Sequence, residues 1–329
     1  MKKRIAIIGA GIGGLTLASR LHSKAEVTVF EKSRGLGGRM STRQAEGFSF
    51  DHGTQFFTAR VPEFKQFLST HLSSGLVQEW AGKVITLEKG KKEEKRIWFE
   101  PHYVCVPGMN FLCKKLAEGI SIRLNCEIAP LRAKAGKEWQ LFDKENNSQG
   151  AFDLVISTAP PAQTIRLFDS FLSVDAGIRQ EKLLACFALM IGLPQSWRHS
   201  WIAAKVKQSP IEWIAVNSSK PGRNQEHTAL VVQTENSWAE AHVEEDLTVA
   251  TKFLREEMES LVGLDLGGAS YISLHRWRYA LLEKAHDDES REMPFFDREL
   301  QLASVGDWCA RSRIEDVWLE ANYLADLVL

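Results

Sequence analysis

The chain opens with an apolar run whose pattern changes from that of a strand to that of a helix. Residues 5–8 (Ile-Ala-Ile-Ile) predict a strand, a glycine-rich turn follows, and residues 15–21 predict a helix. Residues 27–30 predict a second strand, so the first 30 residues form a candidate βαβ unit. Two later apolar segments, 153–157 and 303–305, predict further strands, and prolines at 160 and 161 stop the first of them.

A different pattern begins at Leu183. Several runs rich in Ile, Val and Trp predict strands between residues 183 and 234, of which the first, 183–193, is expected to be buried. Amphipathic stretches predict helices over residues 62–72, 243–261 and 314–327. The second helix is expected to begin with the acids 244–246 and to point Leu247, Ala250, Leu254, Met258 and Leu261 inward. The charged residues 89–96 predict a solvated turn.

The order of these elements predicts an α/β fold in two discontinuous domains. A Rossmann-like dinucleotide-binding domain is expected to take residues 1–60, 104–165 and 290–329. A second domain with a mostly antiparallel sheet is expected to take residues 61–103 and 166–289. The length of 329 residues exceeds one typical domain, and 44% apolar residues suffice for a sizeable core.

Charge and cysteine content exclude several classes of function. The net charge of −1 provides no field to attract nucleic acid or an anionic membrane surface. The basic start and the apolar run after it resemble a signal peptide, but four glycines and the lack of a cleavage motif favour a strand and turn. Five scattered cysteines contain no CxxC pair or metal spacing, which predicts reduced thiols, a cytoplasmic location and no metal site.

The turn after the first strand carries the pattern G-x-G-x-x-G between a strand and a helix. Gly9 suits the tight turn, Gly11 lets the backbone approach a pyrophosphate, and Gly14 lets the helix pack closely on the strand. Phosphates would then bind at the helix start, beside Ile12 and Gly13. Glu31 ends the second strand 20 residues after Gly11, where an acid binds the ribose hydroxyls.

The segment after Glu31 favours FAD over NAD as the ligand. It comprises residues 32–40 (Lys-Ser-Arg-Gly-Leu-Gly-Gly-Arg-Met). A second glycine pair followed by an arginine, directly after the ribose acid, is typical of extended FAD sites. Arg39 offers a forked, charge-assisted contact to a phosphate oxygen. Together with Lys32, Gly38 and Met40, it predicts noncovalently bound FAD.

At this point the chain resembles the renalase family of flavoproteins, which are related to the amine oxidases. Four stretches, spread in order along the chain, carry the resemblance: residues 51–60 (DHGTQFFTAR), 212–221 (EWIAVNSSKP), 275–280 (HRWRYA) and 306–309 (GDWC) with Arg313. The resemblance implies a fold like that of the amine oxidases and p-hydroxybenzoate hydroxylase. The chain departs from the family after Arg313, where a glycine expected close to the flavin is missing.

The resemblance also implies further cofactor contacts. Thr54 and Gln55 are expected beside the isoalloxazine ring, and Asp307 in the ribityl-pyrophosphate region. Ile314 is expected near the flavin pyrimidine. Ile128, placed on a strand after Leu124, is expected at the adenine.

The implied reaction is oxidation of isomeric forms of NAD(P)H, the 2- and 6-dihydro isomers, to NAD(P)+. Oxygen would reoxidise the flavin and yield hydrogen peroxide. A dihydropyridine becomes aromatic when it loses hydride, so the reaction needs no general base, and placement of the donor against the flavin supplies much of the rate. The chain shows no Ser-His-Asp or paired-carboxylate motif, in agreement with this chemistry.

Five residues are candidates for the substrate pocket: Gln55, Asn217, His275, Trp277 and Tyr279. Trp277 is expected to stack on a nicotinamide, and Asn217 and Gln55 to bond its amide. Two alternatives stay open. The first alternative is an amine oxidase, which would need a cage of aromatic side chains around the amine; four tyrosines in the chain support such a cage poorly. The second alternative is a flavin-binding protein without turnover.

Overall fold

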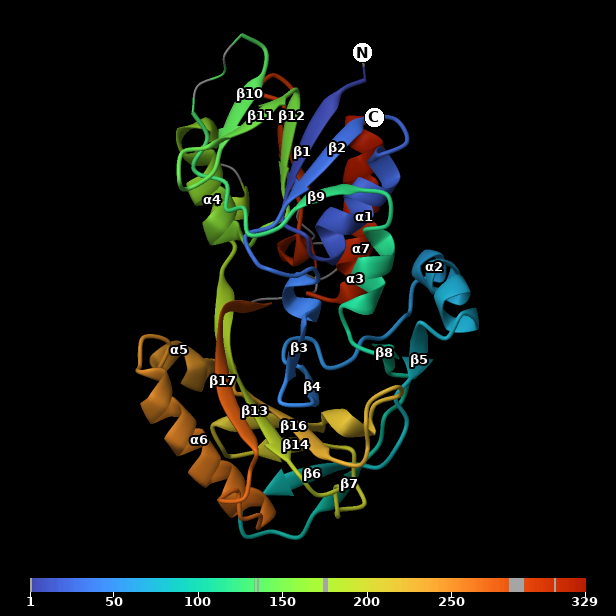
Figure 1. The fold of residues 1–329 in the computed structure, drawn as a ribbon, viewed down its shortest axis with the longest axis vertical. Helices are drawn as coiled ribbons and strands as arrows, with labels where there is room; N and C mark the ends of the chain where they lie inside the picture. Colours follow the sequence, from blue (N-terminus) through green and yellow to red (C-terminus); the bar gives the residue numbers. More distant parts are fainter. Residues whose placement is uncertain (1, 133, 135, 174–176, 284–292, 311) are drawn as a thin grey trace.

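The computed structural model describes residues 2–132, 134, 136–173, 177–283, 293–310 and 312–329. Two sheets organise these residues, one above the other in Figure 1, and the chain crosses between them several times. The α/β class and the mostly antiparallel second sheet are confirmed. The predicted domain boundary at 289–290 lies outside the described residues.

The upper sheet has six strands in the order β18-β19-β12-β1-β2-β9. All neighbours are parallel except β18 and β19. Its strands are β1 (Arg4–Ile8), β2 (Glu26–Phe30), β9 (Ser121–Arg123), β12 (Leu154–Ser157), β18 (Phe295–Asp297) and β19 (Leu302–Ser304). Ile5 of β1 faces Val27 on one side and Leu154 on the other, so the apolar run of the first strand is buried by its neighbours.

Helices cover both faces of this sheet. The predicted first helix is α1 (Ile12–Leu21), and it packs beside the terminal helix α7 (Ile314–Val328) and near α3 (Phe111–Leu116) (Figure 1). Helix α4 (Pro161–Phe168) lies on the other side of the sheet, with the hairpin of β10 (Trp139–Phe142) and β11 (Ser148–Phe152). The predicted βαβ unit and Rossmann-like domain are therefore confirmed, and helices cover a largely parallel sheet.

The lower sheet has seven strands in the order β17-β13-β16-β15-β14-β6-β7. Only β14 and β6 pair in parallel. Its strands are β6 (Val84–Glu88), β7 (Glu94–Arg96), β13 (Leu183–Leu193), β14 (Ala203–Lys207), β15 (Ile211–Val216), β16 (Thr228–Thr234) and β17 (Tyr271–Leu282). Strand β13 has the predicted bounds and is almost wholly buried.

The helices of the lower body are α5 (Asn236–Ala241) and α6 (Leu247–Val262). Ala250, Leu254 and Met258 are buried, as their spacing predicts. The helix begins four residues later than expected, because Asp246 caps it by accepting a hydrogen bond from the backbone N–H of Thr248. Leu247 consequently lies in the first turn and is exposed, which corrects its predicted inward position.

The remaining segments include one whose structure differs from the prediction and one that matches it. Residues 94–96, predicted as part of a turn, form the exposed edge strand β7. Helix α2 (Pro62–Ser73) forms as predicted, and its Phe67 stacks on Trp318 of the upper body's α7. The remaining short elements are β5 (Val77–Glu79), β8 (Tyr103–Cys105) and the 3-10 turns Gly38–Met40, Asp169–Phe171, Gly177–Gln180, Asn217–Ser219 and Asp307–Cys309.

A hairpin of β3 (Thr42–Ala45) and β4 (Phe48–Asp51) joins the two bodies. It had no clear signal in the sequence pattern. Phe48 and Phe50 pack against Met190 and Val231 of the lower sheet. A segment predicted to belong wholly to the first domain therefore contributes to the core of the second.

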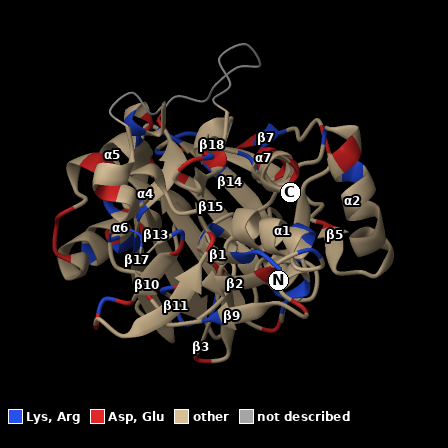
Figure 2. Ribbon diagram, turned by 90° about the horizontal axis from the view of Figure 1, so that it is seen from above, with Lys and Arg blue, Asp and Glu red and all other residues tan. Residues whose placement is uncertain are grey.

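Buried charge fixes the base of this hairpin. The Asp51 carboxylate accepts hydrogen bonds from Lys220 at 3.1 Å and Arg223 at 2.7 Å, and all three side chains are buried. Burial alone would raise the pKa of Asp51, but the two cations outweigh it and lower the pKa to about 2. Figure 2 shows Lys and Arg and also Asp and Glu scattered over many elements.

In the described part of the chain, we find no helix with the length and apolar character needed to cross a bilayer.

Candidate functional site

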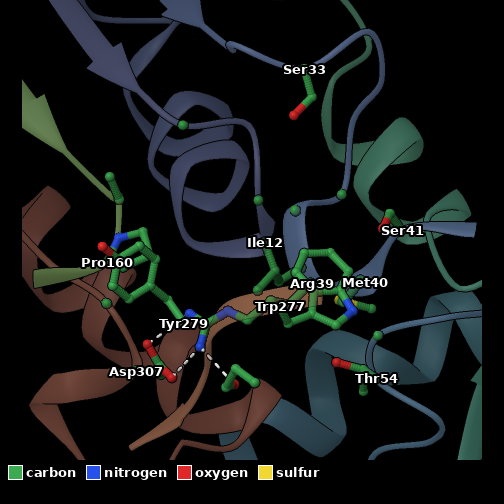
Figure 3. Close-up of a pocket in the computed structure, with 18 of the residues that line it drawn as sticks. Ile12, Ser33, Arg39, Met40, Ser41, Thr54, Pro160, Trp277, Tyr279 and Asp307 are labelled. Carbon is green, nitrogen blue, oxygen red and sulfur yellow. Dashed lines mark hydrogen bonds and ion pairs between the residues drawn. The ribbon is translucent and has the colours of Figure 1, made fainter. Parts of the chain in front are cut away.

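A cleft of about 1410 Å³ lies where the two bodies meet. Its walls come from the loop after β1, the residues after β2, the middle and end of β17, and the turn after β19. Pockets for single small ligands usually measure about 300–1,000 Å³, so this cleft has room for a dinucleotide and a second ligand. Figure 3 shows residues of both bodies around it.

The glycine loop forms the wall at the carboxyl end of β1. Gly9 has a φ of +109°, and a Cβ there would lie 2.6 Å from Oγ1 of Thr158. A Cβ on Gly14 would overlap the carbonyl oxygen of Gly9, so only glycine lets α1 approach the strand this closely. A Cβ on Gly11 would meet nothing and would protrude into open space. Gly11 caps α1, whose first backbone N–H groups lack helical partners and suit a phosphate.

Glu31 follows β2 and is buried at the edge of the cleft. One carboxylate oxygen accepts from the backbone N–H of Ala10 at 2.9 Å, and the other accepts from that of Ser33 at 2.8 Å. Each oxygen keeps a lone pair for a further donor. The carboxylate is therefore held rigidly beside the glycine loop, where ribose hydroxyls can donate to it.

Arg39 and Asp307 form a bidentate ion pair across the cleft wall (Figure 3). The distances are 2.5 Å from Nη1 to Oδ2 and 2.7 Å from Nη2 to Oδ1. Nη1 also donates to the carbonyl of Ala280 at 3.2 Å, which leaves two of the five guanidinium donors for a phosphate. Burial alone would raise the pKa of Asp307, but the charge of Arg39 outweighs it and the pKa is lowered.

The other candidate cofactor residues occupy several walls of the cleft. Ile12, Gly13, Lys32, Gly38, Met40, Thr54, Ile128 and Ile314 line it, whereas Gly14 lies beneath the loop. The backbone N–H of Thr54 donates to the carbonyl of Arg39 at 2.8 Å, which ties the two motifs together. Ile128 is not on a strand, contrary to expectation, because the sheet ends at Arg123 and Ile128 only bridges to Asp143.

Strand β17 supplies an aromatic wall. The imidazole of His52 stacks on the indole of Trp277 at 5.3 Å and meets His275 edge-on at 4.9 Å. Nε1 of Trp277 donates to the carbonyl of His52 at 2.8 Å, which fixes the plane of the indole. Burial, together with nearby positive charge, lowers the pKa of His52 to about 3 and that of His275 to about 4. Both imidazoles are neutral at physiological pH.

The amides of Gln55 and Asn217 form hydrogen bonds within the protein. Gln55 borders the cleft, but its amide nitrogen donates to the carbonyls of Asp51 and Gly53, and its oxygen accepts from Lys220. Asn217 is fully buried outside the cleft lining, and its amide bonds the backbone of Ser49 and Asp51. Both donor hydrogens of the Gln55 amide are therefore used inside the protein, and the Asn217 amide is buried away from the cleft. Trp277, His275 and Tyr279 do line the cleft.

Several cleft residues were missed from the sequence. His52 lies inside the quoted 51–60 motif but was not chosen, and its partners come from a strand more than 200 residues away. Phe56 and Trp213 face each other at 5.8 Å on another wall. Arg43 of β3 also lines the cleft. His52, Phe56 and Trp213 all lie in the quoted motifs, which was a usable signal, whereas Arg43 lies in none of them.

The cysteines and possible metal ligands complete the inventory. All five cysteines are buried thiols, and burial raises the pKa of Cys105 to about 12 and that of Cys186 to about 11. Within the residues that the structure describes, no three His, Cys, Asp or Glu side chains are grouped to hold a metal ion.

Comparisons with known proteins agree with this architecture. Residues 7–70 match the profile of the NAD(P)-binding Rossmann-like domain. A stretch of 51 residues is 51% identical to 4,4'-diapophytoene desaturase (4,4'-diaponeurosporene-forming) of Staphylococcus aureus (strain Newman). That match covers 15% of this chain and 10% of the desaturase.

Solved structures match over the full length. A structure from Exiguobacterium sp. 255-15 that carries the provisional name protoporphyrinogen oxidase has a TM-score of 0.79 and 14% identity, with 100% of this chain and 99% of that chain covered. Wild-type putrescine oxidase bound to putrescine has a TM-score of 0.73 and 11% identity, with 100% and 99% covered. At these identities the comparison shows a shared fold.

The cleft fits FAD by its own geometry. Its volume exceeds the need of one small ligand, Gly11 leaves open space at a helix start, and Glu31 is held beside it. Arg39 keeps two donors free in the middle of the cleft, between the glycine loop and the aromatic wall. The chain is thus a two-domain protein with a Rossmann-like nucleotide-binding domain, and its cofactor is FAD.

Proposed function

We propose that this protein is an FAD-dependent oxidase that takes hydride from the 2- and 6-dihydro isomers of NAD(P)H and regenerates NAD(P)+. Oxidation in general is supported by the fold, which is shared with proteins named as a protoporphyrinogen oxidase and a putrescine oxidase. The choice of substrate rests on one observation, the charge of the cleft.

Ten basic residues border the cleft against four acidic ones. Two of the ten, Arg276 and Arg278, alternate with Trp277 along β17 and bond Val243 and Glu244 on the other face of the strand. The basic residues are Lys32, Arg34, Arg39, Arg43, Lys144, Arg166, Lys205, Arg276, Arg278 and Arg313, and the acidic ones are Glu31, Glu127, Glu212 and Asp307. The pyrophosphate of FAD balances part of this excess. The remainder favours an anionic second ligand, such as a nicotinamide nucleotide, and opposes an alkylammonium.

The aromatic wall suits a reaction that moves no proton from the substrate. His52 and His275 have lowered pKa values of about 3 and 4, so they are weak bases at neutral pH. A dihydronicotinamide that loses hydride becomes an aromatic pyridinium and needs no such base. Trp277, fixed by its bond to His52, offers a flat surface for the ring. Bound FAD would supply the hydride acceptor. Oxygen would then take the two electrons from the reduced flavin and be converted to hydrogen peroxide.

An amine oxidase is the second candidate. It is favoured by the fold shared with putrescine oxidase and by the aromatic side chains of Trp277 and Tyr279, which both line the cleft. It is opposed by the excess of cationic side chains.

Anaerobic bleaching of the bound flavin tests the proposal. The protein is mixed with the 2- and 6-dihydro isomers of NADH and NADPH, with ordinary NADH, and with a panel of mono- and diamines. Rapid loss of flavin absorbance with the isomers alone is the expected result. Rapid bleaching by amines would establish the second candidate instead. A flavin that none of these reduces would indicate a binding protein without turnover.

A further inference from the structure

Arg43 is a cation of the cleft that has no acidic partner in the described part of the chain. It lies on β3, is half-buried, and borders the cleft beside the aromatic wall. Among the described residues, its guanidinium makes one hydrogen bond, a long contact of 3.3 Å from Nη1 to Oγ of Ser273. Within the described ranges, no carboxylate lies within ion-pair distance of it. Arg39, by contrast, is neutralised by Asp307, and Arg278 by Glu244.

The surroundings of Arg43 increase its need for a counter-charge. His52 and His275 are close enough for the charge of Arg43 to oppose their protonation. Neutral rings provide no charge to offset the guanidinium, and partial burial removes some of its hydration. A half-buried arginine that keeps most of its five donors free is suited to bind a phosphate or carboxylate.

The strand beside Arg43 places this cation in line with the ring-binding surface. Ser273, His275 and Trp277 are two residues apart along β17, so their side chains lie on the same face of the strand. Ser273 contacts Arg43, His275 contacts His52, and Trp277 stacks on His52. At about 3.3 Å per residue, Ser273 and Trp277 are about 13 Å apart along the strand. A ring at Trp277 and an anion at Arg43 would then lie on either side of His275, and the sugar that joins them would cross this imidazole.

We propose that Arg43, assisted by the hydroxyl of Ser273, binds the phosphate of a dihydronicotinamide nucleotide whose ring lies at Trp277. This assignment rests on the proposed function, because it states which part of that substrate is recognised. It predicts selection for phosphorylated donors over the corresponding nucleosides. It also assigns a binding role to a residue outside the motifs identified in the sequence.

The test compares donors that differ only in the phosphate. The 2- and 6-dihydro isomers of nicotinamide mononucleotide and of nicotinamide riboside are mixed anaerobically with FAD-loaded protein, and the Kd is taken from the concentration dependence of bleaching. Arg43→Gln is expected to raise the Kd of the mononucleotide isomers by roughly 10- to 100-fold. The change for the riboside isomers is expected to be at least fivefold smaller. Arg43→Lys should recover part of the loss, because it keeps the charge without the fork.

Arg96→Gln, on the exposed strand β7, is the matched control for removal of a positive charge from the lower body. Equal changes for mononucleotide and riboside, or no change for either, would overturn the assignment. Flavin content and the thermal midpoint show whether Arg43→Gln is folded; if it is not, the comparison is made with Arg43→Lys and Ser273→Ala.

A second measurement separates this inference from the proposed function. Oxidised nicotinamide mononucleotide is titrated into the protein and followed through the flavin absorbance spectrum. If no dihydronicotinamide bleaches the flavin, the proposed function fails. In that case, salt-sensitive binding of the mononucleotide that Arg43→Gln abolishes still supports an anion site. If the wild-type protein does not bind the mononucleotide, the anion site fails as well.

Discussion

Replacing Arg39 with alanine leaves the carboxylate of Asp307 buried without a counter-ion. Asp307 is 4% exposed and loses both charged hydrogen bonds from the guanidinium. Among the described residues it keeps the contact with Oγ of Ser312 at 3.1 Å and a hydrogen bond from its own backbone N–H. Removing one member of a buried ion pair costs about 3–5 kcal/mol. The side chain of Arg39 is 30% exposed, so the lower end, about 3 kcal/mol, is the better estimate.

This cost converts to a shift in thermal midpoint. Unfolding entropy of about 2.1 cal/mol/K per residue amounts to roughly 0.7 kcal/mol/K for this chain, so about 3 kcal/mol lowers the midpoint by about 4 °C. The measurement is thermal unfolding of flavin-free protein, followed by circular dichroism. Protein without flavin is used so that loss of the cofactor does not contribute to the shift.

The dependence on pH identifies the cause. In the wild type the pKa of Asp307 is lowered, so its stabilising contribution is present above the unfolded pKa of about 3.9 and is lost as pH falls through the folded pKa. In Arg39→Ala burial is no longer opposed, so the carboxyl group can take up a proton at mildly acidic pH. The difference between variant and wild type should therefore shrink between pH 7 and pH 4.

Asp307→Asn in the Arg39→Ala background provides the control. It removes the stranded charge and should restore more than half of the lost stability at pH 7. A destabilisation that is the same at both pH values and that asparagine does not relieve would refute the reasoning.

Three further outcomes are expected. Denaturing the protein should release yellow FAD into the supernatant; flavin retained in the precipitate would indicate a covalent link, which should then map to Cys309 near the Asp307 turn. The rate of flavin bleaching by dihydronicotinamide isomers should be nearly flat from about pH 6 to 9, because His52 and His275 have pKa values of about 3 and 4, whereas an amine, with a reference pKa of about 10.4, should react faster as pH rises. Trp277→Ala should slow bleaching by the isomers while FAD stays bound, and flavin content measured beside the rate tests this; unchanged rates would place the ring elsewhere.

Much of the fold was predictable because it depends on local pattern. The glycines after β1, the run that became β13 and the face of α6 each carry their signal within one element. The β3–β4 hairpin escaped prediction because its apolar residues pack on strands that follow more than a hundred residues later. Edge strand β7 escaped because its residues are charged and exposed.

The cleft was less predictable because the direction of a side chain depends on distant partners. Gln55 was a reasonable amide candidate, yet buried Lys220 can only donate and holds the amide oxygen of Gln55 inward. Arg39 and Asp307 were each identified, but their pairing joins residues 268 positions apart. His52 became part of the aromatic wall only through the register of β17.

Strand β17 belongs to both ligand sites at once. Its end is fastened to the upper body, where the carbonyl of Ala280 accepts from Arg39 and the backbone N–H of Leu282 donates to Ser312 at 3.2 Å. Its middle carries Trp277 and His275, and Figure 1 shows the strand rising from the lower sheet toward the upper body. If one ligand orders β17, its binding includes the conformational entropy cost of ordering the strand, and the second ligand then binds without incurring that cost again. The affinities for cofactor and substrate are then coupled, and each ligand tightens the binding of the other by the same factor. If association rates are unchanged, FAD should therefore dissociate more slowly, by that factor, when the cleft also holds a nucleotide.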